Sequence, residues 1–305
     1  MVIVFLLLGI VFLLVGGDLL VKSSASLAAK LNVSPFLIGI TVVSFGTSAP
    51  ELLVSLNAAF QGSAGIAIGN VIGSNIANIA LVLGLTIIIR SIKIESNRYL
   101  FPWCVMLVSS IMFYGFSLDG EIDSVDGLFF ISGLLLFITL SIRYRHSNIE
   151  EEEADDALST RMIPLYLILG ATGLYFGSEF LVGSSVAIAE YFHISEFVIG
   201  ITIVALGTSL PELVTSLIAI LRGQSSISIG NLIGSNIFNI FAVLGITSLV
   251  KPLGAHRNLL TTDLPIMIGV TLLLGLFLFL SRKLRRIEGV LLISIYIIYL
   301  VFSIS

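Results

Sequence analysis

The chain has 305 residues, which by length alone would suit two soluble domains. Composition excludes that reading, because hydrophobic residues make up 57% of the chain and charged residues only 11%, against about 25% charge in a soluble domain. The mean hydropathy of +1.11 places the chain in a lipid bilayer. A net charge of −4 argues against a nucleic-acid partner. The single cysteine, Cys104, cannot form an internal disulfide, and we expect it to be inert.

Ten apolar stretches are long enough to cross a bilayer, since a spanning helix needs about 20 residues. In chain order they cover residues 2–29, 36–60, 66–89, 99–118, 125–142, 163–189, 197–221, 227–250, 262–280 and 287–303. This pattern predicts an all-α polytopic membrane protein with ten transmembrane helices. The first stretch has no basic residue before its apolar core, so we interpret it as a retained helix and not as a signal peptide.

The basic residues predict the orientation. With the N-terminus outside, thirteen of the fifteen Lys and Arg residues fall in cytoplasmic loops, and only Lys251 and Arg257 remain outside. Cytoplasmic loops hold an excess of basic residues, so both termini are predicted outside. The longest loop, residues 143–161, is then cytoplasmic and carries six acidic residues. Such a run is typical of a solvated linker, and a weak calcium-sensing role is the alternative.

An internal repeat organises the chain. Residues 36–86 align without a gap with residues 197–247, and 31 of the 51 pairs are identical. Each half holds five predicted helices, and this odd number turns the second half upside down, as in the inverted repeats of secondary transporters. We therefore expect a first repeat over 1–142, an acidic loop over 143–161 and a second repeat over 162–305. Asp18 pairs with Glu179 in the repeat, and both a helix-packing role and a role at an ion entrance stay open for them.

Both copies contain Gly-Thr-Ser-x-Pro-Glu followed by Gly-Asn-x-Ile-Gly-Ser-Asn-Ile-x-Asn. The first motif ends at Glu51 in one copy and at Glu212 in the other, and these are the only carboxylates near the middle of their helices. An ionised carboxylate at the bilayer centre costs at least about 2.5–3.5 kcal/mol. A bound cation compensates for that cost, whereas a protonated structural pair is the alternative.

The spacing places several oxygen-bearing side chains together. Thr47 and Ser48 precede Glu51 by four and three residues, so the three share one helical face. Ser74 and Asn78 share a face in the same way. The repeated glycines suit either close helix packing or the lining of an ion path.

A proline inside each of these helices predicts a break. Pro50 clashes with the carbonyl four residues earlier and removes a backbone donor, so carbonyls near Gly46 are freed, and Pro211 does the same in the second copy. Inversion brings the two breaks together near the midplane. Because sulfur and histidine are missing from these motifs, the oxygen set favours calcium, magnesium or sodium over zinc or copper.

These paired motifs resemble the two alpha repeats of the sodium/calcium exchanger family, within the calcium/cation antiporter superfamily, and the prokaryotic type in particular. The resemblance covers all ten helices in topology and is most specific in the two repeated segments. It implies exchange of Ca²⁺ for Na⁺ by alternating access, with the ions bound between the second, third, seventh and eighth helices.

The resemblance also implies a set of ion ligands at matching positions. These are the carboxylates of Glu51 and Glu212, the carbonyl and hydroxyl oxygens of Thr47 and Thr208, the hydroxyls of Ser48, Ser209, Ser74 and Ser235, the amides of Asn78 and Asn239, and the backbone carbonyls of Ser44 and Ala205.

One position departs from the family pattern. Asn239 stands where many members have an aspartate, which leaves two central carboxylates. One Ca²⁺ or two Na⁺ neutralise a site of charge −2, and a third Na⁺ makes the exchange electrogenic, with about 2.3 kcal/mol per charge available for each 100 mV. Asn239 favours sodium coupling over proton coupling, while stoichiometry and potassium dependence stay open.

Other function classes are less favoured. A proton- or potassium-coupled antiporter is the main alternative. A calcium channel is less favoured, because pores are usually rings of several subunits. The chain lacks the motifs of phosphate-binding loops and zinc hydrolases, so we expect neither an enzyme nor a cofactor. The expected partners are Ca²⁺, Na⁺ and the lipid bilayer. We expect a prokaryotic plasma membrane protein in which a monomer suffices for transport; its oligomeric state stays open.

Overall fold

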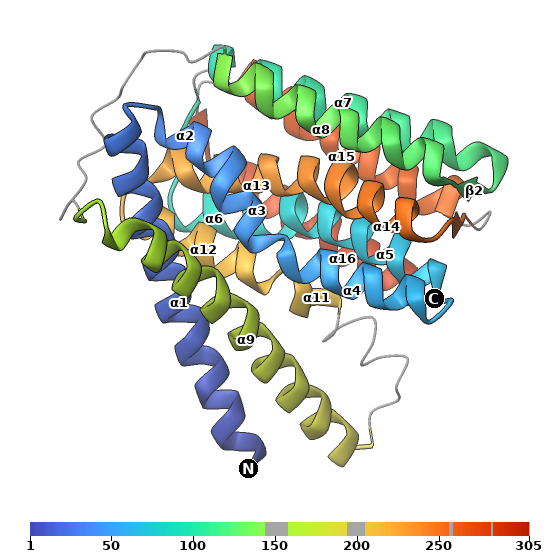
Figure 1. Ribbon diagram of the computed structural model, residues 1–305, viewed down its shortest axis with the longest axis horizontal. Helices are drawn as coiled ribbons and strands as arrows, with labels where there is room; N and C mark the ends of the chain where they lie inside the picture. The colour runs from blue at the N-terminus through green and yellow to red at the C-terminus, as the bar shows by residue number, and fades with distance from the viewer. Residues whose placement is uncertain (95, 144–157, 194–204, 256–258, 282, 305) are drawn as a thin grey trace.

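The computed structural model describes residues 1–94, 96–143, 158–193, 205–255, 259–281 and 283–304, and helices dominate it (Figure 1). The first half contains α1 (Val2–Leu31), α2 (Pro35–Ile38), η1 (Gly39–Val43), α3 (Ser44–Thr47), α4 (Ala49–Phe60), α5 (Ala64–Ile76), η2 (Ala77–Leu83), α6 (Gly84–Ile89), β1 (Ile92–Lys93), α7 (Ser96–Phe116), η3 (Ser117–Asp119), β2 (Glu121–Ile122) and α8 (Ser124–Arg143). The second half contains α9 (Met162–Tyr191), α11 (Ala205–Thr208), α12 (Leu210–Leu221), α13 (Ser225–Phe238), η5 (Asn239–Leu244), α14 (Gly245–Val250), β3 (Leu253–Gly254), η6 (Leu259–Asp263), α15 (Leu264–Leu280), β4 (Lys283–Leu284) and α16 (Arg286–Ile304).

Nine of the ten predicted spans are confirmed within a few residues in the described part of the chain. Eight continuous helical segments in the described part of the chain are long and apolar enough to cross a membrane, and a ninth span is made of two pieces, Pro35–Thr47 and Ala49–Phe60, bent by 41°. The seventh predicted span, 197–221, is described from residue 205 onward and includes α11 and α12. Most of the predicted acidic loop lies outside the described residues.

Local sequence signals set the ends of the first spans. Asn32 ends α1 in the left-handed conformation (φ 54°, ψ 49°), which asparagine tolerates better than most residues. Two residues later the Ser34 side chain accepts a hydrogen bond from the backbone N–H of Leu37, and Pro35 occupies the first turn of α2. Serine caps a helix start, and proline suits a position whose N–H would have no helical partner.

The two spans that carry the second motif form the centre of the molecule. The most apolar window of Ala64–Ile89 is 72% buried and that of Ser225–Val250 is 83% buried, against 17% for the last helix, α16. Outer helices keep large apolar side chains such as Leu14, Leu128 and Ile298 exposed. This is the pattern of a bundle whose outer surface faces lipid.

Helices α1 and α9 pack closely side by side, diagonally to the rest of the bundle (Figure 1). A β-carbon added at Gly16 would lie 2.9 Å from the carbonyl oxygen of Gly170, and one at Gly9 would lie 2.9 Å from that of Gly177. Glycines at these positions let the two backbones touch, as small residues do in membranes.

Two pairs of short antiparallel strands show the inverted symmetry directly. Strand β1 pairs with β4, and β2 pairs with β3. The repeat makes β1 equivalent to β3 at an offset of 161 and β2 equivalent to β4 at an offset of 162. The two pairings are therefore the same contact seen from opposite ends. The fold is an all-α polytopic membrane protein of two inverted repeats, joined by small bridges between the loops.

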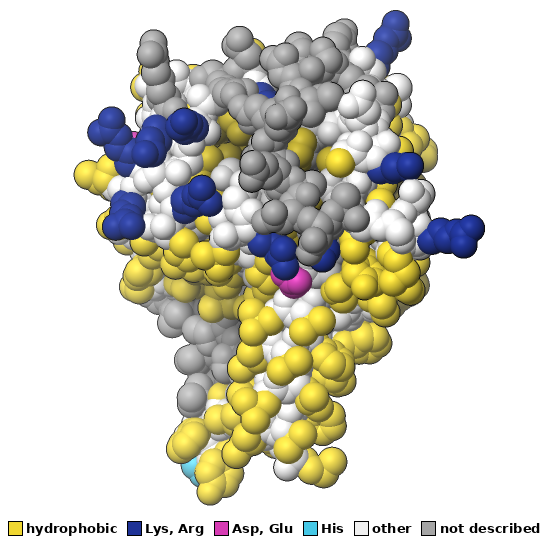
Figure 2. All heavy atoms as spheres, turned by 90° about the vertical axis from the view of Figure 1, so that its left-hand side faces the viewer, with side chains coloured by type: hydrophobic (Ala, Val, Ile, Leu, Met, Phe, Trp, Pro, Cys, Tyr) yellow, Lys and Arg dark blue, Asp and Glu magenta, His cyan; other side chains and the backbone are white. Residues whose placement is uncertain are grey.

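Basic side chains gather at one end of the bundle. Strand β2 lies at the right-hand end of Figure 1, and Figure 2 views the opposite end, where Lys and Arg side chains lie above a largely hydrophobic region. The β1–β4 pairing sets Lys93 opposite Lys283. Arg90 donates to the carbonyl oxygen of Ile220, in the last turn of α12, at 3.2 Å.

Asp18 of α1 has a partner in the second repeat. It forms an ion pair with Arg222, the C-cap residue of α12, whose Nε donates to Asp18 Oδ1 at 2.7 Å. Glu179, its counterpart in the repeat, is exposed. Gln61 stands at the place equivalent to Arg222 and donates to Asn57 at 3.1 Å. Asp18 thus links α1 to α12, and within the described residues the other repeat does not reproduce this contact.

Candidate ion-binding site

Both buried glutamates lie in the first turn of a helix that follows a break. Helix α3 ends at Thr47 and α4 begins at Ala49, with Ser48 between them at φ −88° and ψ 4°. Ser209 has nearly the same angles, −86° and 4°, before α12. A proline occupies the first turn of each new helix, so the break predicted from Pro50 and Pro211 is confirmed.

The start of a helix is a favourable place for a carboxylate. Glu51 and Glu212 each stand in the first turn of a 12-residue helix and have 0% of their surface exposed. The positive end of the helix dipole offsets part of the cost of the buried negative charge. It leaves most of that cost, because desolvating an ion takes several kcal/mol.

The two carboxylates have different partners. The hydroxyl of Ser48 donates to Glu212 Oε1 at 3.1 Å, so the break in one repeat contacts the glutamate of the other. Across the described residues, both carboxylate oxygens of Glu51, the Oε2 of Glu212 and the hydroxyl of Ser209 have no hydrogen-bond partner. Three buried carboxylate oxygens are thus available to a cation.

Hydroxyl pairs join the two repeats on either side of these glutamates. Thr47 Oγ1 lies 3.2 Å from Ser235 Oγ, and Ser74 Oγ lies 3.5 Å from Thr208 Oγ1. The repeat makes the two pairs equivalent. Thr47 also donates to Asn231 Oδ1 at 3.0 Å. Threonine and serine residues that the sequence placed in one set therefore do meet, across the interface between α3 and α13 and between α11 and α5.

The two predicted amides occupy the start of π-helical segments. Asn78 and Asn239 are fully buried, at 0% exposed. Each follows the serine of its motif, Ser74 or Ser235, by four residues and so lies on the same helical face. Segment η2 packs against α12 and η5 packs against α4, so each amide belongs to a segment that contacts the helix with the other repeat's glutamate.

The predicted backbone ligands are less available. The Ser44 carbonyl accepts from the backbone N–H of Ser48 at 2.9 Å and lies 3.3 Å from Thr47 Oγ1. The Gly207 carbonyl accepts from the hydroxyl of Ser178 at 2.6 Å. Ala205 is the first residue of α11. Side-chain oxygens therefore dominate the part of the site that the structure describes.

The donor set suits hard cations. The described residues contain no group of three or more His, Cys, Asp and Glu side chains that would hold a metal ion. The oxygens gathered around Glu51 and Glu212 are carboxylates, hydroxyls and amides, which are the ligands of calcium and, for the same reason of hardness, of sodium.

Both halves of the chain match one family model. The model described as sodium/calcium exchanger protein matches residues 1–143 and 162–305. The chain belongs to the sodium/calcium exchanger family. Similar members include the sodium/calcium exchanger MaX1 of Methanosarcina acetivorans, 34% identical over 97% of this chain and 96% of that protein. The inner membrane protein YrbG of Escherichia coli is 31% identical over 97% of this chain and 94% of its own length.

Solved structures of an exchanger have the same fold. The sodium-calcium exchanger NCX_Mj soaked with 10 mM Na⁺ and zero Ca²⁺ is 37% identical and matches with a TM-score of 0.87 over 99% of both chains. The resemblance inferred from the paired motifs is thereby confirmed at the level of family and fold.

Several polar residues around the candidate site were not singled out from the sequence. Asn70 donates to Ser55 Oγ at 3.0 Å and to the Glu51 carbonyl at 3.1 Å, and Asn231 donates to Ser216 Oγ at 3.2 Å. These bonds hold each broken helix against its neighbour. Their signal was present, since Ser55 and Asn70 are identical to Ser216 and Asn231 in the repeat.

Proposed function

We propose that this chain exchanges Ca²⁺ for Na⁺ across a membrane by alternating access, with both ions competing for one site between the two repeats. Glu51 and Glu212 supply the charge. Hydroxyls of Thr47, Ser48, Ser74, Thr208, Ser209 and Ser235, amides of Asn78 and Asn239, and backbone carbonyls near Ser44 and Ala205 complete the ligands. Transport requires no bound cofactor and no chemical reaction.

One observation carries the proposal. Two fully buried carboxylates stand at equivalent breaks of two inverted repeats, and three of their four oxygens are without a hydrogen-bond partner in the described structure. An uncompensated buried charge is strongly destabilising. A divalent cation or two monovalent cations neutralise the pair, and an empty site is disfavoured. Exchange follows, because one ion leaves most easily when another replaces it.

The first prediction concerns these carboxylates. In sealed proteoliposomes an outward Na⁺ gradient should drive Ca²⁺ uptake, and both Glu51→Gln and Glu212→Gln should abolish it, since each halves the charge of the site. Radioactive Ca²⁺ uptake is the measurement. Glu190→Gln, which changes an exposed carboxylate at the end of α9, is the matched control and should transport normally.

Varying the gradients one at a time separates the alternatives. Uptake that follows a proton gradient and ignores Na⁺ would contradict sodium coupling. A requirement for K⁺ on the sodium side would identify a potassium-coupled exchanger. Passive Ca²⁺ flux without any opposing gradient, at rates above those of a conformational cycle, would identify a channel.

The proposal includes a location and an orientation. We place the chain in a prokaryotic plasma membrane with both termini outside and the acidic loop of residues 143–161 in the cytoplasm. The basic loops support this orientation, because Lys93, Lys283 and their neighbours gather at one end of the bundle. The two repeats, 1–142 and 162–305, act as the two halves of a transporter that works as a single chain.

A further inference from the structure

We infer that Asn75, held by Met267, fixes the side-chain amide of Asn239 so that its oxygen and not its NH₂ group is presented to the transported cation. Asn75 and Met267 are thus positioning residues for the site. The inference rests on the proposed function and names two residues that lie outside the predicted ligand set.

Three buried side chains from three elements form a chain of contacts. Asn239 Nδ2, at the start of η5, donates to Asn75 Oδ1 of α5 at 3.3 Å. Asn75 Nδ2 in turn lies 3.6 Å from the sulfur of Met267 in α15. The three residues are 0%, 2% and 1% exposed. Water therefore does not compete for these polar atoms.

The sulfur of Met267 determines which group donates and which accepts in each of these contacts. A thioether carries no polar hydrogen, so Met267 can only accept, and Asn75 must turn its NH₂ group toward the sulfur. The oxygen of Asn75 then faces Asn239 and can only accept. Asn239 must therefore donate a hydrogen bond from its own NH₂ group. Its oxygen is left over, and among the described residues that oxygen has no hydrogen-bond partner.

The direction matters because the two ends of an amide have opposite effects on a cation. The oxygen is a calcium ligand, whereas the NH₂ group carries partial positive charge and repels the ion. An unrestrained asparagine can turn over and present either end. An aspartate has no such ambiguity, since both of its terminal atoms are oxygen. At a position where the family often has aspartate, an asparagine serves only if its orientation is fixed.

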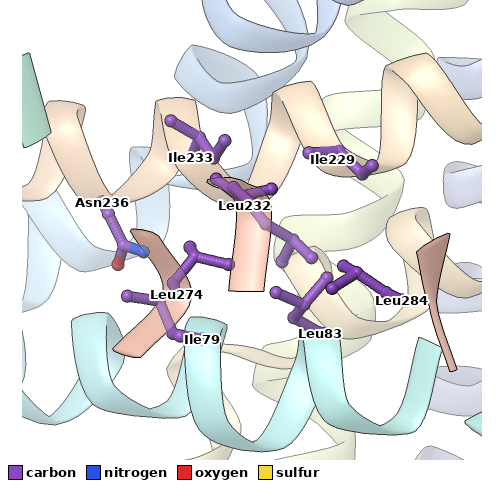
Figure 3. A pocket seen from close by; sticks show the side chains of 9 residues that line it. Ile79, Leu83, Ile229, Leu232, Ile233, Asn236, Leu274 and Leu284 are labelled. Atoms are coloured by element: carbon purple, nitrogen blue, oxygen red, sulfur yellow. The ribbon is translucent and has the colours of Figure 1, made fainter. Parts of the chain in front are cut away.

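The other repeat contains the same three residue types without the same contacts. Asn236, Asn78 and Met106 are the equivalents of Asn75, Asn239 and Met267 at the offset of 161. Within the described structure neither terminal atom of Asn236 or of Asn78 has a hydrogen-bond partner. Asn236 instead lines a small cavity with apolar side chains such as Ile79 and Leu274 (Figure 3). Of the two predicted amide ligands, Asn239 is the one that a hydrogen bond holds in one orientation within the described residues.

The test compares Ca²⁺ affinity of the purified full-length protein by calorimetry in two backgrounds. With Asn239 present, Asn75→Ala should weaken Ca²⁺ binding about three- to tenfold, the loss expected for one buried hydrogen bond. With Asn239→Ala the same change should have no further effect. With Asn239→Asp it should also cause no weakening, because a carboxylate needs no orientation. Met267→Leu, which keeps shape and burial, should weaken binding in the same direction if Asn239 is present.

Asn236→Ala is the matched control, because it removes an equally buried amide that orients nothing. A loss of affinity from Asn75→Ala that is equal in the Asn239 and Asn239→Ala backgrounds, or equal to that of Asn236→Ala, overturns the inference, as does an unchanged affinity in Met267→Leu. These results leave the exchanger intact. An unmodified protein without sodium-driven Ca²⁺ uptake overturns the proposed function itself, so the two failures are distinct.

Discussion

Ser48 and Ser209 stand at equivalent breaks, yet only Ser48 donates to a glutamate. Its hydroxyl contacts Glu212 at 3.1 Å, whereas the structure as described gives the Ser209 hydroxyl and the Glu51 carboxylate no partner. A hydrogen bond to a carboxylate reduces its demand for other ligands. The two glutamates therefore offer a cation unequal coordination, despite the symmetry of the chain.

At the residue scale, Asn239→Asp should make transport sensitive to acid. The substitution adds a third carboxylate to a buried pair, and three like charges in one site favour binding of a proton. Calcium uptake of the variant should fall as pH is lowered through a range in which the unmodified protein still works. The measurement is sodium-driven uptake across a pH series. Identical profiles would remove Asn239 from the ion site.

At the scale of elements, packing decides which glycines are needed. Helices α1 and α9 touch through glycine, and a β-carbon at Gly16 would come within 2.9 Å of the Gly170 carbonyl oxygen. On the same helix pair, nothing lies within 4 Å of a β-carbon added at Gly183. Gly16 and Gly183 are both glycines within long helices, but only Gly16 faces the backbone of the neighbouring helix.

Gly16→Ala should therefore destabilise the protein, and Gly183→Ala should not. Overpacking costs about 1–3 kcal/mol, while a helical Gly→Ala change by itself gains up to about 1 kcal/mol. Thermal unfolding in detergent measures the difference. Equal melting temperatures for the two variants would show that the α1–α9 contact is loose.

Hydropathy and the repeat predicted the spans, because apolar length and residue identity are local properties of the sequence. The π-helical segments η2 and η5 were not predicted, since an extra residue in a helical turn depends on what packs against it. The strands β1 to β4 have two residues each and no alternation long enough to recognise. Glu51 and Pro50 were enough to predict the site from the sequence. The contact of Asn75 with Met267 was not predictable, because the two residues are far apart in the chain and no spacing rule connects them.

At the scale of the whole molecule, the bridges β1–β4 and β2–β3 give an orientation test. Cys104→Ser provides a background without cysteine, since the chain has only one. In intact cells, Glu121→Cys of β2 should react with a membrane-impermeant thiol reagent, and Lys93→Cys of β1 should react only after permeabilisation. Lys283→Cys, opposite Lys93, should behave like Lys93→Cys.

Labelling measured by gel shift decides between the orientations. Reaction of the Lys93→Cys and Lys283→Cys variants from outside, with protection of Glu121→Cys, would reverse the topology. Reaction of all three from the same side would contradict the placement of the two bridges at opposite ends of the bundle.

The ion pair between Asp18 and Arg222 shows that the two repeats of one chain need not stay identical. The strand bridges repeat the same contact at both ends, as the interface of a two-fold dimer does. In a dimer of identical halves, every change in one half is copied in the other. Joined in one chain, the halves can differ: Asp18 of the first repeat is paired with Arg222, whereas the equivalent positions hold Glu179 and Gln61. Each half can then be adjusted separately, without a matching change in the other.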